Sequence, residues 1–106
     1  MPFYLWQGSY NTSGVQGLQK DGGSKRAQMV RGMIEKVGGK LHAFYYCFGD
    51  SDVIGIAEFP DHATAVAVSL AVNASGAVSL KSTVLLTPED VDKATKMQVG
   101  YKAPGS

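Results

Sequence analysis

His42, Tyr46 and Glu58 are the residues of this chain whose types and spacing best suit acid–base chemistry. They fall within one β-rich stretch, Lys40–Pro60, at positions that could share one face of a sheet. A histidine beside a carboxylate can be held in one tautomer and act as a base, with a tyrosine as proton donor. Inside a closed cavity such a trio could abstract an acidic proton from an aromatic or keto substrate. The structural alternative is an ordinary cross-strand pair of His42 and Glu58 beside a packed Tyr46.

A second set of residues could line a pocket for a small apolar or aromatic ligand. Its members are aromatic and aliphatic residues of the predicted strands together with one carboxylate: Tyr4, Trp6, Phe44, Asp52, Ile54 and Ile56. Aromatic residues on a sheet that meets a partner are equally expected as interface anchors. Asp52 could contact a ligand at the mouth of a pocket between subunits. Alternatively, its carboxylate accepts backbone N–H groups and fixes the turn before it.

The remaining reactive side chains indicate no further site. Cys47 is the only cysteine, which excludes an internal disulfide and a cysteine-based metal cluster, and it is expected as a core residue of an apolar strand. His62 lies just inside a predicted helix start and is expected to be a solvated surface residue. Because the two histidines have no clear set of further ligands, we predict no metal site and no cofactor.

The charge and hydrophobicity of the chain exclude two classes of partner. The net charge is +1 and the basic residues are scattered, whereas a nucleic-acid surface usually shows a basic stripe. No apolar run approaches the roughly 18 residues that span a bilayer, and the first residues lack the pattern of a signal peptide. We therefore expect a cytoplasmic protein with no nucleic-acid partner and no membrane contact.

The stretch Lys40–Pro60 predicts a β-hairpin that would position most of these residues. Its parts are a strand over Lys40–Phe48, a turn at Gly49–Ser51 and a strand over Asp52–Phe59. With this three-residue turn the expected pairs are Tyr46 with Ile54, Phe44 with Ile56, and His42 with Glu58. A loop one residue shorter would shift the pairs across the sheet.

The other elements follow from hydrophobic spacing and from capping residues. We predict a strand over Pro2–Tyr10, a loop over Asn11–Gly23 in which Val15–Gln19 could form one helical turn, and a helix over Ser24–Val37 that is capped by Ser24 and ended by Gly38 in the left-handed conformation. A helix capped by Asp61 and running to about Ser75, a strand over Gly76–Leu86 and a short helix from Thr87 to Met97 follow. A chain of 106 residues is one domain, which we place at residues 1–97, with a loose or draped tail at residues 98–106.

This order of elements predicts an α+β, ferredoxin-like βαββαβ fold with an antiparallel four-stranded sheet and a short C-terminal helix. Both main helices would cover one face of the sheet. Every predicted strand has apolar residues on both sides, so the other face would expose more apolar surface than soluble monomers tolerate. We therefore expect two copies to pack sheet against sheet as a homodimeric α+β barrel. The helix over residues 61–75 is apolar on two sides, which leaves room for a higher oligomer.

The run from Ser24 to Asp61, SKRAQMVRGMIEKVGGKLHAFYYCFGDSDVIGIAEFPD, resembles the GYD-domain family of small bacterial proteins. The family shows a lysine–arginine helix start, a glycine pair before the second strand and a glycine–x–tyrosine–aspartate turn. The resemblance implies a ferredoxin-like fold of the dimeric α+β barrel type and no assigned activity. The chain departs at Ser51, where the family has tyrosine, so a ligand role of that tyrosine does not carry over.

Three classes of function are open at this point. The first is a small-molecule-binding or accessory protein without catalysis. The second is a cofactor-independent oxygenase or isomerase that acts in the barrel cavity, an idea that depends on analogy between folds. The third is a structural assembly module. An enzyme predicts His42 or Glu58 pointing into a closed cavity, whereas a binding protein predicts apolar walls with few polar groups.

Overall fold

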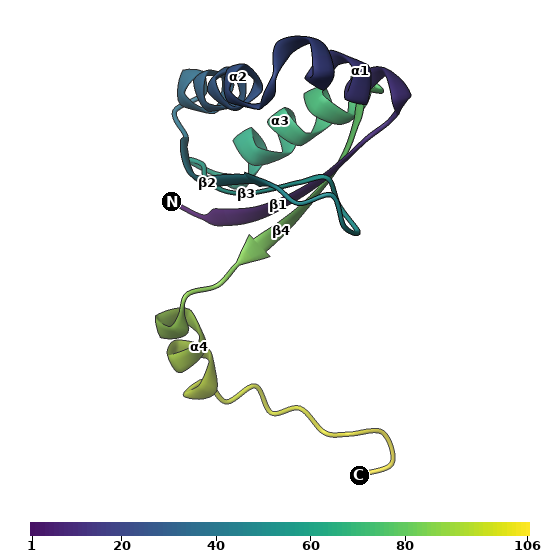
Figure 1. Cartoon of the computed structure of the whole chain (residues 1–106). Coiled ribbons are helices and arrows are strands. Elements are labelled where there is room, and N and C mark those ends of the chain that lie inside the picture. Colours follow the sequence, from purple (N-terminus) through teal and green to yellow (C-terminus); the bar gives the residue numbers. More distant parts are fainter.

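A computed structural model describes the whole chain, residues 1–106, as one antiparallel sheet with the first three of its four helices on one face and the last helix on a projecting C-terminal segment (Figure 1). The elements are β1 Phe3–Tyr10, α1 Thr12–Asp21, α2 Gly23–Lys36, β2 Lys40–Tyr46, β3 Val53–Glu58, α3 His62–Ala74, β4 Val78–Leu85 and α4 Pro88–Thr95. The strand order is β2-β3-β1-β4. This confirms the predicted α+β, ferredoxin-like fold. None of the helices has the length and apolarity that crossing a membrane requires.

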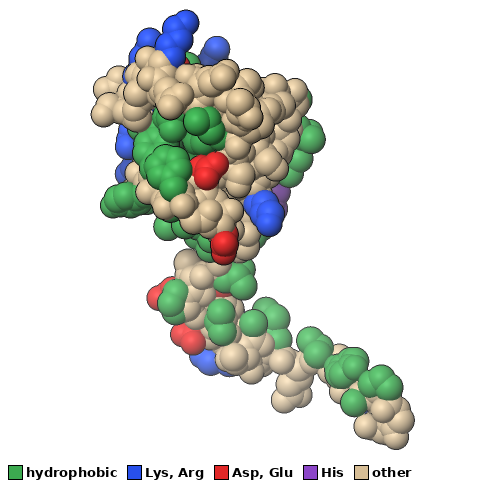
Figure 2. Space-filling view, turned by 45° about the vertical axis from the view of Figure 1, so that its right-hand side comes forward, with side chains coloured by type: hydrophobic (Ala, Val, Ile, Leu, Met, Phe, Trp, Pro, Cys, Tyr) green, Lys and Arg blue, Asp and Glu red, His purple; other side chains and the backbone are tan.

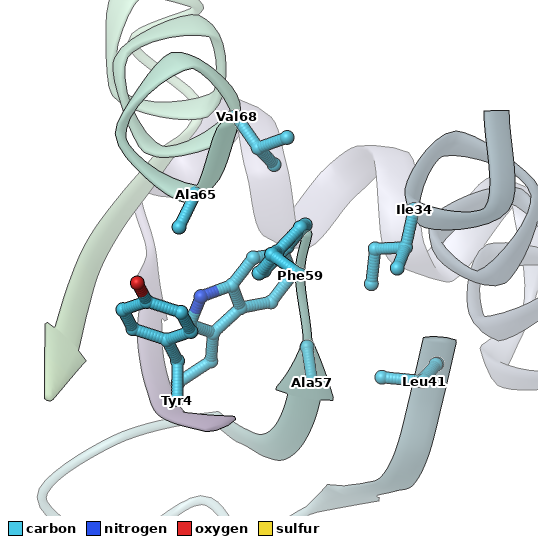
Figure 3. Close-up of a cluster of buried hydrophobic side chains, with 8 residues drawn as sticks. Tyr4, Ile34, Leu41, Ala57, Phe59, Ala65 and Val68 are labelled. Atoms are coloured by element: carbon cyan, nitrogen blue, oxygen red, sulfur yellow. The ribbon is translucent and has the colours of Figure 1, made fainter. Parts of the chain in front are cut away.

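The hydrophobic core lies between the sheet and the helices α2 and α3. Figure 3 shows aromatic residues of the sheet beneath α3 and Ile34 of α2 facing them. The core consists of Tyr4, Trp6, Ile34, Leu41, Ala57, Phe59, Ala65 and Val68. Burial of such side chains stabilises the fold by roughly 1.5–3 kcal/mol for each large one. Tyr4 and Trp6 of β1 therefore point toward the helices, and their neighbours Phe3 and Leu5 point away from them.

The prediction of a loop over residues 11–23 is wrong, because α1 occupies most of it. Asn11 caps this helix, with its side-chain oxygen accepting the N–H of Gly14 at 2.9 Å. A Cβ atom at Gly14 would collide with the carbonyl oxygen of Ala77 and lie 3.0 Å from the ring of Tyr10. The glycine thus permits close packing of α1 on the sheet rather than breaking the helix.

The helix α2 begins one residue earlier than predicted, and its N-cap is Gly22, so the predicted cap Ser24 is wrong. Gly38 follows the helix with φ 84°, in the left-handed conformation that was predicted. The cap Asp61 is confirmed for α3, where its carboxylate accepts the N–H of Thr64 at 2.7 Å. Ala65 and Val68 form the core side of α3, whereas the other apolar side, with Val66 and Leu70, is exposed.

The predicted hairpin exists, but its register is wrong. The strands β2 and β3 are joined by residues 47–52 instead of a three-residue turn, and Phe48 in this loop has a positive φ of 51°. Tyr46 pairs with Val53, Tyr45 with Ile54, Phe44 with Gly55 and Ala43 with Ile56. A β-bulge between Leu41 and Ala43 inserts His42 as an extra residue. Cys47 lies beyond the strand end and is exposed, so the prediction of a core cysteine is also wrong.

The sheet face away from the helices, called the open face below, is apolar mainly over β1, β2 and β3, and on β4 only at Leu85, which lies beside Phe3. Its apolar residues on β1, β2 and β3 are Phe3, Leu5, Ala43, Tyr45, Ile54 and Ile56, which we call the open apolar surface. On β4 the neighbours of Leu5 and Gln7 are Thr83 and Lys81, which are polar and exposed. The prediction that every strand has apolar residues on both sides therefore holds for β4 through Leu85 alone on the open face, whereas Val78 and Leu80 face the helices.

The chain beyond β4 leaves the body of the protein (Figure 1). We call residues 86–106 the C-terminal arm; all of them are exposed. As predicted, the arm contains a short helix, α4, which Thr87 and Asp90 start with a complete capping box. The radius of gyration is 17.2 Å, whereas a compact chain of this length has about 13 Å. Residues 98–106 form no helix or strand.

Candidate functional site

His42 and Glu58 form a polar pair on the open face. Nε2 of His42 and Oε1 of Glu58 are 2.9 Å apart, and both side chains are partly exposed, at 31% and 21%. Because an ionised carboxylate can only accept, the N–H at Nε2 donates to Glu58, and in a neutral imidazole the free lone pair is then on Nδ1. The ring of Phe3 stacks on the imidazole at 4.9 Å between centroids and 25° between planes. The β-bulge, the hydrogen bond to Glu58 and the stacked ring of Phe3 together fix the orientation of His42.

A shallow apolar groove adjoins this pair. It has a volume of about 140 Å³ and is lined by Leu5, Ala43, Tyr45, Ile54, Gly55 and Ile56. Glu58 follows Ile56 on the same face of β3, so its carboxylate lies beyond the Ile56 end of the groove, and neither Glu58 nor His42 lines the groove itself. Tyr45 is 68% exposed at one wall. The open face therefore offers an apolar trough with a single histidine–carboxylate pair near its end.

Tyr46 does not belong to this group. Its phenol O–H donates to the backbone carbonyl of Gly23 at 3.0 Å, and its ring meets Phe44 edge to face at 5.4 Å, both on the side of the helices. Burial raises the pKa of Tyr46, and the nearby Tyr10 raises it further. The prediction that His42, Tyr46 and Glu58 share one face is wrong for Tyr46, because the longer loop shifts the register by one residue.

The six predicted ligand-contact residues are divided between the two faces of the sheet. Ile54 and Ile56 line the groove of the open face. Trp6 and Phe44 line a different cavity of about 70 Å³ on the helix side, and Tyr4 packs in the core. The indole N–H of Trp6 is buried and has no hydrogen-bond partner.

Asp52 has the structural role that was considered for it. Its carboxylate accepts the backbone N–H of Tyr10 at 2.8 Å, and its own N–H donates to the carbonyl of Gly8 at 2.8 Å. Both bonds join the start of β3 to the end of β1. The carboxylate therefore fixes the sheet beside the loop, and Asp52 is not among the residues that line the groove.

Two arrangements on the helix side were missed by the sequence analysis. The phenol of Tyr4 is hydrogen-bonded to Nδ1 of His62, a residue that was expected to be merely solvated. Burial raises the pKa of Tyr4, and the charge of Asp61 raises it further.

A cavity of about 160 Å³ lies under α1, where Tyr10 and Arg26 are among its lining residues. This cavity could not be predicted, because residues of α1 line it and the sequence predicted a loop there. The bond between Tyr4 and His62 could not be predicted either, because no sequence pattern connects the two residues.

No group of three or more histidine, cysteine or carboxylate side chains is placed to hold a metal ion. Cys47 is exposed, and its thiol donates to the carbonyl oxygen of Ser51 at 3.1 Å. The chemistry available on the open face is thus hydrogen bonding and proton transfer by His42 and Glu58.

Comparison with known proteins gives one match. The family model of the GYD domain covers residues 4–95, from β1 to the end of α4. No curated protein and no solved structure matches the chain.

Proposed function

The chain belongs to the GYD-domain family, and from the geometry of its open face we propose that it is a small-molecule-binding protein, without catalysis, that assembles as a homodimer. The observation that carries this proposal is the apolar groove that runs toward the pair of His42 and Glu58. Ligand sites are mostly apolar with a few placed polar groups, and this combination occurs here on an uncovered surface.

The groove by itself is too shallow to enclose a ligand. A second copy packed on the open apolar surface would cover it and turn it into a cavity between subunits, and it would remove that surface from water. The ligand we expect is a small aromatic or aliphatic molecule with one hydrogen-bonding group. Its apolar part would lie on Ile54 and Ile56, and its polar group would face His42 or Glu58.

Methyl NMR can test this site, because the chain has only three isoleucines. Ile54 and Ile56 lie in the groove, whereas Ile34 is fully buried in the core and serves as an internal control. We expect phenol, benzoate or indole to shift the δ1-methyl signals of Ile54 and Ile56 and to leave that of Ile34 in place. Shifts confined to Ile34, or no shifts at millimolar concentrations of these probes, would overturn the proposal.

A pair of histidine variants tests the polar end of the groove. His42→Ala is expected to weaken the binding of phenol severalfold and to leave the binding of toluene, which has no polar group, unchanged. His62→Ala is the matched control, because that histidine bonds to Tyr4 on the helix side. Equal affinities of phenol for the wild type and for His42→Ala would rule out His42 as the polar anchor.

The bond between His42 and Glu58 favours a second candidate, a cofactor-independent enzyme that abstracts a proton next to a carbonyl group. In this scheme Nδ1 of His42 takes a proton from carbon, and Glu58 stabilises the imidazolium that forms. The exchange of the methyl protons of acetophenone in D₂O, followed by ¹H NMR, would measure it. The enzyme predicts faster exchange than buffer, lost in His42→Gln; a rate equal to that of buffer would exclude proton abstraction from this substrate class.

A further inference from the structure

The C-terminal arm contains a regular helix, α4, that does not pack against the rest of the chain. From Thr87 onward, no hydrogen bond joins it to the rest of the protein, and all of its hydrogen bonds are internal. Figure 2 shows the arm projecting from the body with hydrophobic side chains along it. They include Val91, Met97, Val99 and Tyr101, which are 48%, 68%, 83% and 78% exposed. Four apolar side chains on one projecting segment are an interaction surface without a partner in its own chain.

The arm nevertheless belongs to the domain. The GYD-domain match extends to residue 95, the last residue of α4, so the family domain includes this helix. An isolated helix of eight residues is marginal in water, even with a capping box. The helix α4 is thus stable only when it packs against something, and it does not pack on its own body. It therefore requires a surface from another molecule.

The direction of the arm indicates where that surface lies. Leu85, the last residue of β4, pairs with Phe3, and Phe3 pairs with Glu58 on its other side. The arm therefore leaves the sheet at the end that carries the His42–Glu58 pair. It starts beside the open face, whose open apolar surface lies on β1, β3 and β2, while β4 presents Lys81 and Thr83 there and only Leu85 as an apolar residue.

We propose that the arm is exchanged between two copies of this chain, the arm of each copy packing its apolar side chains on the open apolar surface of the other. This inference rests on the proposed homodimer and adds a second contact to it. Sheet-against-sheet packing alone would set Lys81 and Thr83 of β4 in the interface, whereas the arm supplies apolar side chains that β4 lacks there. The exchanged arm would also close the groove near His42 and Glu58 of the partner.

Cross-linking of mixed copies tests the exchange directly. Chains labelled with ¹⁴N and ¹⁵N are mixed, treated with a lysine-reactive cross-linker and digested, and the linked peptides are identified by mass spectrometry. The arm carries Lys93, Lys96 and Lys102, and the sheet carries Lys40 and Lys81. We expect links between an arm lysine and a sheet lysine to occur in mixed-isotope form. Arm-to-sheet links found only within one isotope would show that the arm folds on its own chain and would overturn the exchange.

Three variants separate the arm from the sheet contact. Val99→Glu is expected to weaken the dimer at least tenfold in sedimentation experiments, whereas Gln98→Glu, the same charge change one residue earlier, is not. Ile56→Glu tests the sheet surface. If Ile56→Glu gives monomers while Val99→Glu dimerises like Gln98→Glu, the arm exchange is wrong and the proposed homodimer stands. A wild-type protein that is monomeric at high micromolar concentration would overturn both.

Discussion

At the scale of single residues, the tyrosines that face the helices connect burial with pH dependence. Burial raises the pKa of Tyr4, Tyr10 and Tyr46 because the charged phenolate is poorly solvated there. The folded protein then keeps these phenols protonated at a pH where the unfolded chain begins to lose protons. The contribution to stability is complete below about pH 10 and is lost as the pH rises above it.

Tyr4→Phe tests this relation. The variant removes the hydrogen bond to His62, whose ring is exposed and can bond to water instead, so we expect a loss of about 1 kcal/mol in the free energy of unfolding at pH 7. It also removes one phenol whose pKa is raised in the folded state, so the free energy of unfolding should fall less steeply between pH 10 and pH 11. Urea unfolding at both pH values measures the two effects. An unchanged alkaline slope would contradict the assigned role of Tyr4.

The lowered pKa of Asp61 should make the stability of the protein depend on pH in the opposite direction, at low pH. The backbone N–H of Thr64 bonds to its carboxylate and lowers the pKa of Asp61. A lowered pKa in the folded state gives stability that is present above about pH 4 and lost as the pH falls below it. Asp61→Ala should therefore lower the urea midpoint at pH 7 and flatten its decline below pH 4, whereas Asp61→Ser should keep most of the cap. Equal midpoints of Asp61→Ala and the wild type at pH 7 would argue against the cap.

The pair of His42 and Glu58 shows what residue patterns can and cannot predict. The sequence led to the correct contact through an incorrect register, because the β-bulge at His42 restores the alignment that the longer loop removes. A bulge and a loop length depend on hydrogen bonds between strands, for which residue types give little information. Tyr46 lies closer to the loop, where nothing compensates for the shift, and it faces the helices.

At the scale of elements, strong periodicity or caps made most helices and strands predictable. The helix α2, the helix α3 with its cap Asp61, and the helix α4 with its Thr87 cap were all expected. The helix α1 was not, since its sequence TSGVQGLQKD carries two glycines and few apolar residues. Glycine was interpreted as a loop former, whereas the structure uses Gly14 for close packing against Ala77.

Two glycines of α1, Gly14 and Gly17, provide a matched pair of alanine substitutions with opposite expected effects on the free energy of unfolding. Gly17→Ala meets no atom within 4 Å and should stabilise the protein by up to about 1 kcal/mol, because alanine is the better helix former. Gly14→Ala collides with backbone at Ala77 and with Tyr10, and should destabilise it by roughly 1–3 kcal/mol. Chemical unfolding followed by circular dichroism measures both. Stabilisation by both substitutions would contradict the close packing of α1 on the sheet.

At the scale of the whole molecule, one face of the sheet is covered by helices and the other is not. The helix side has a closed core around Phe59 and Ile34, both fully buried. The open face has no cover, and the C-terminal arm has no support. The sequence predicted an uncovered apolar sheet face with residues from all four strands, and β4 contributes only Leu85 to it. The arm was outside that reasoning, because a capped helix with few apolar residues gives no indication of where it packs.

The arm exchange predicts that the protection of α4 depends on protein concentration. Hydrogen exchange of peptides that cover residues 87–97 should be slow at high micromolar concentration, where dimers form, and fast after dilution below the dissociation constant. Peptides from α3 should be equally protected at both concentrations, because Ala65 and Val68 anchor that helix in the core of its own chain. The small size of α4 makes the contrast large, since eight residues form a stable helix in water only against another surface. Protection of α4 that persists in a demonstrated monomer would mean that its own chain supports the helix, and the exchange would have to be abandoned.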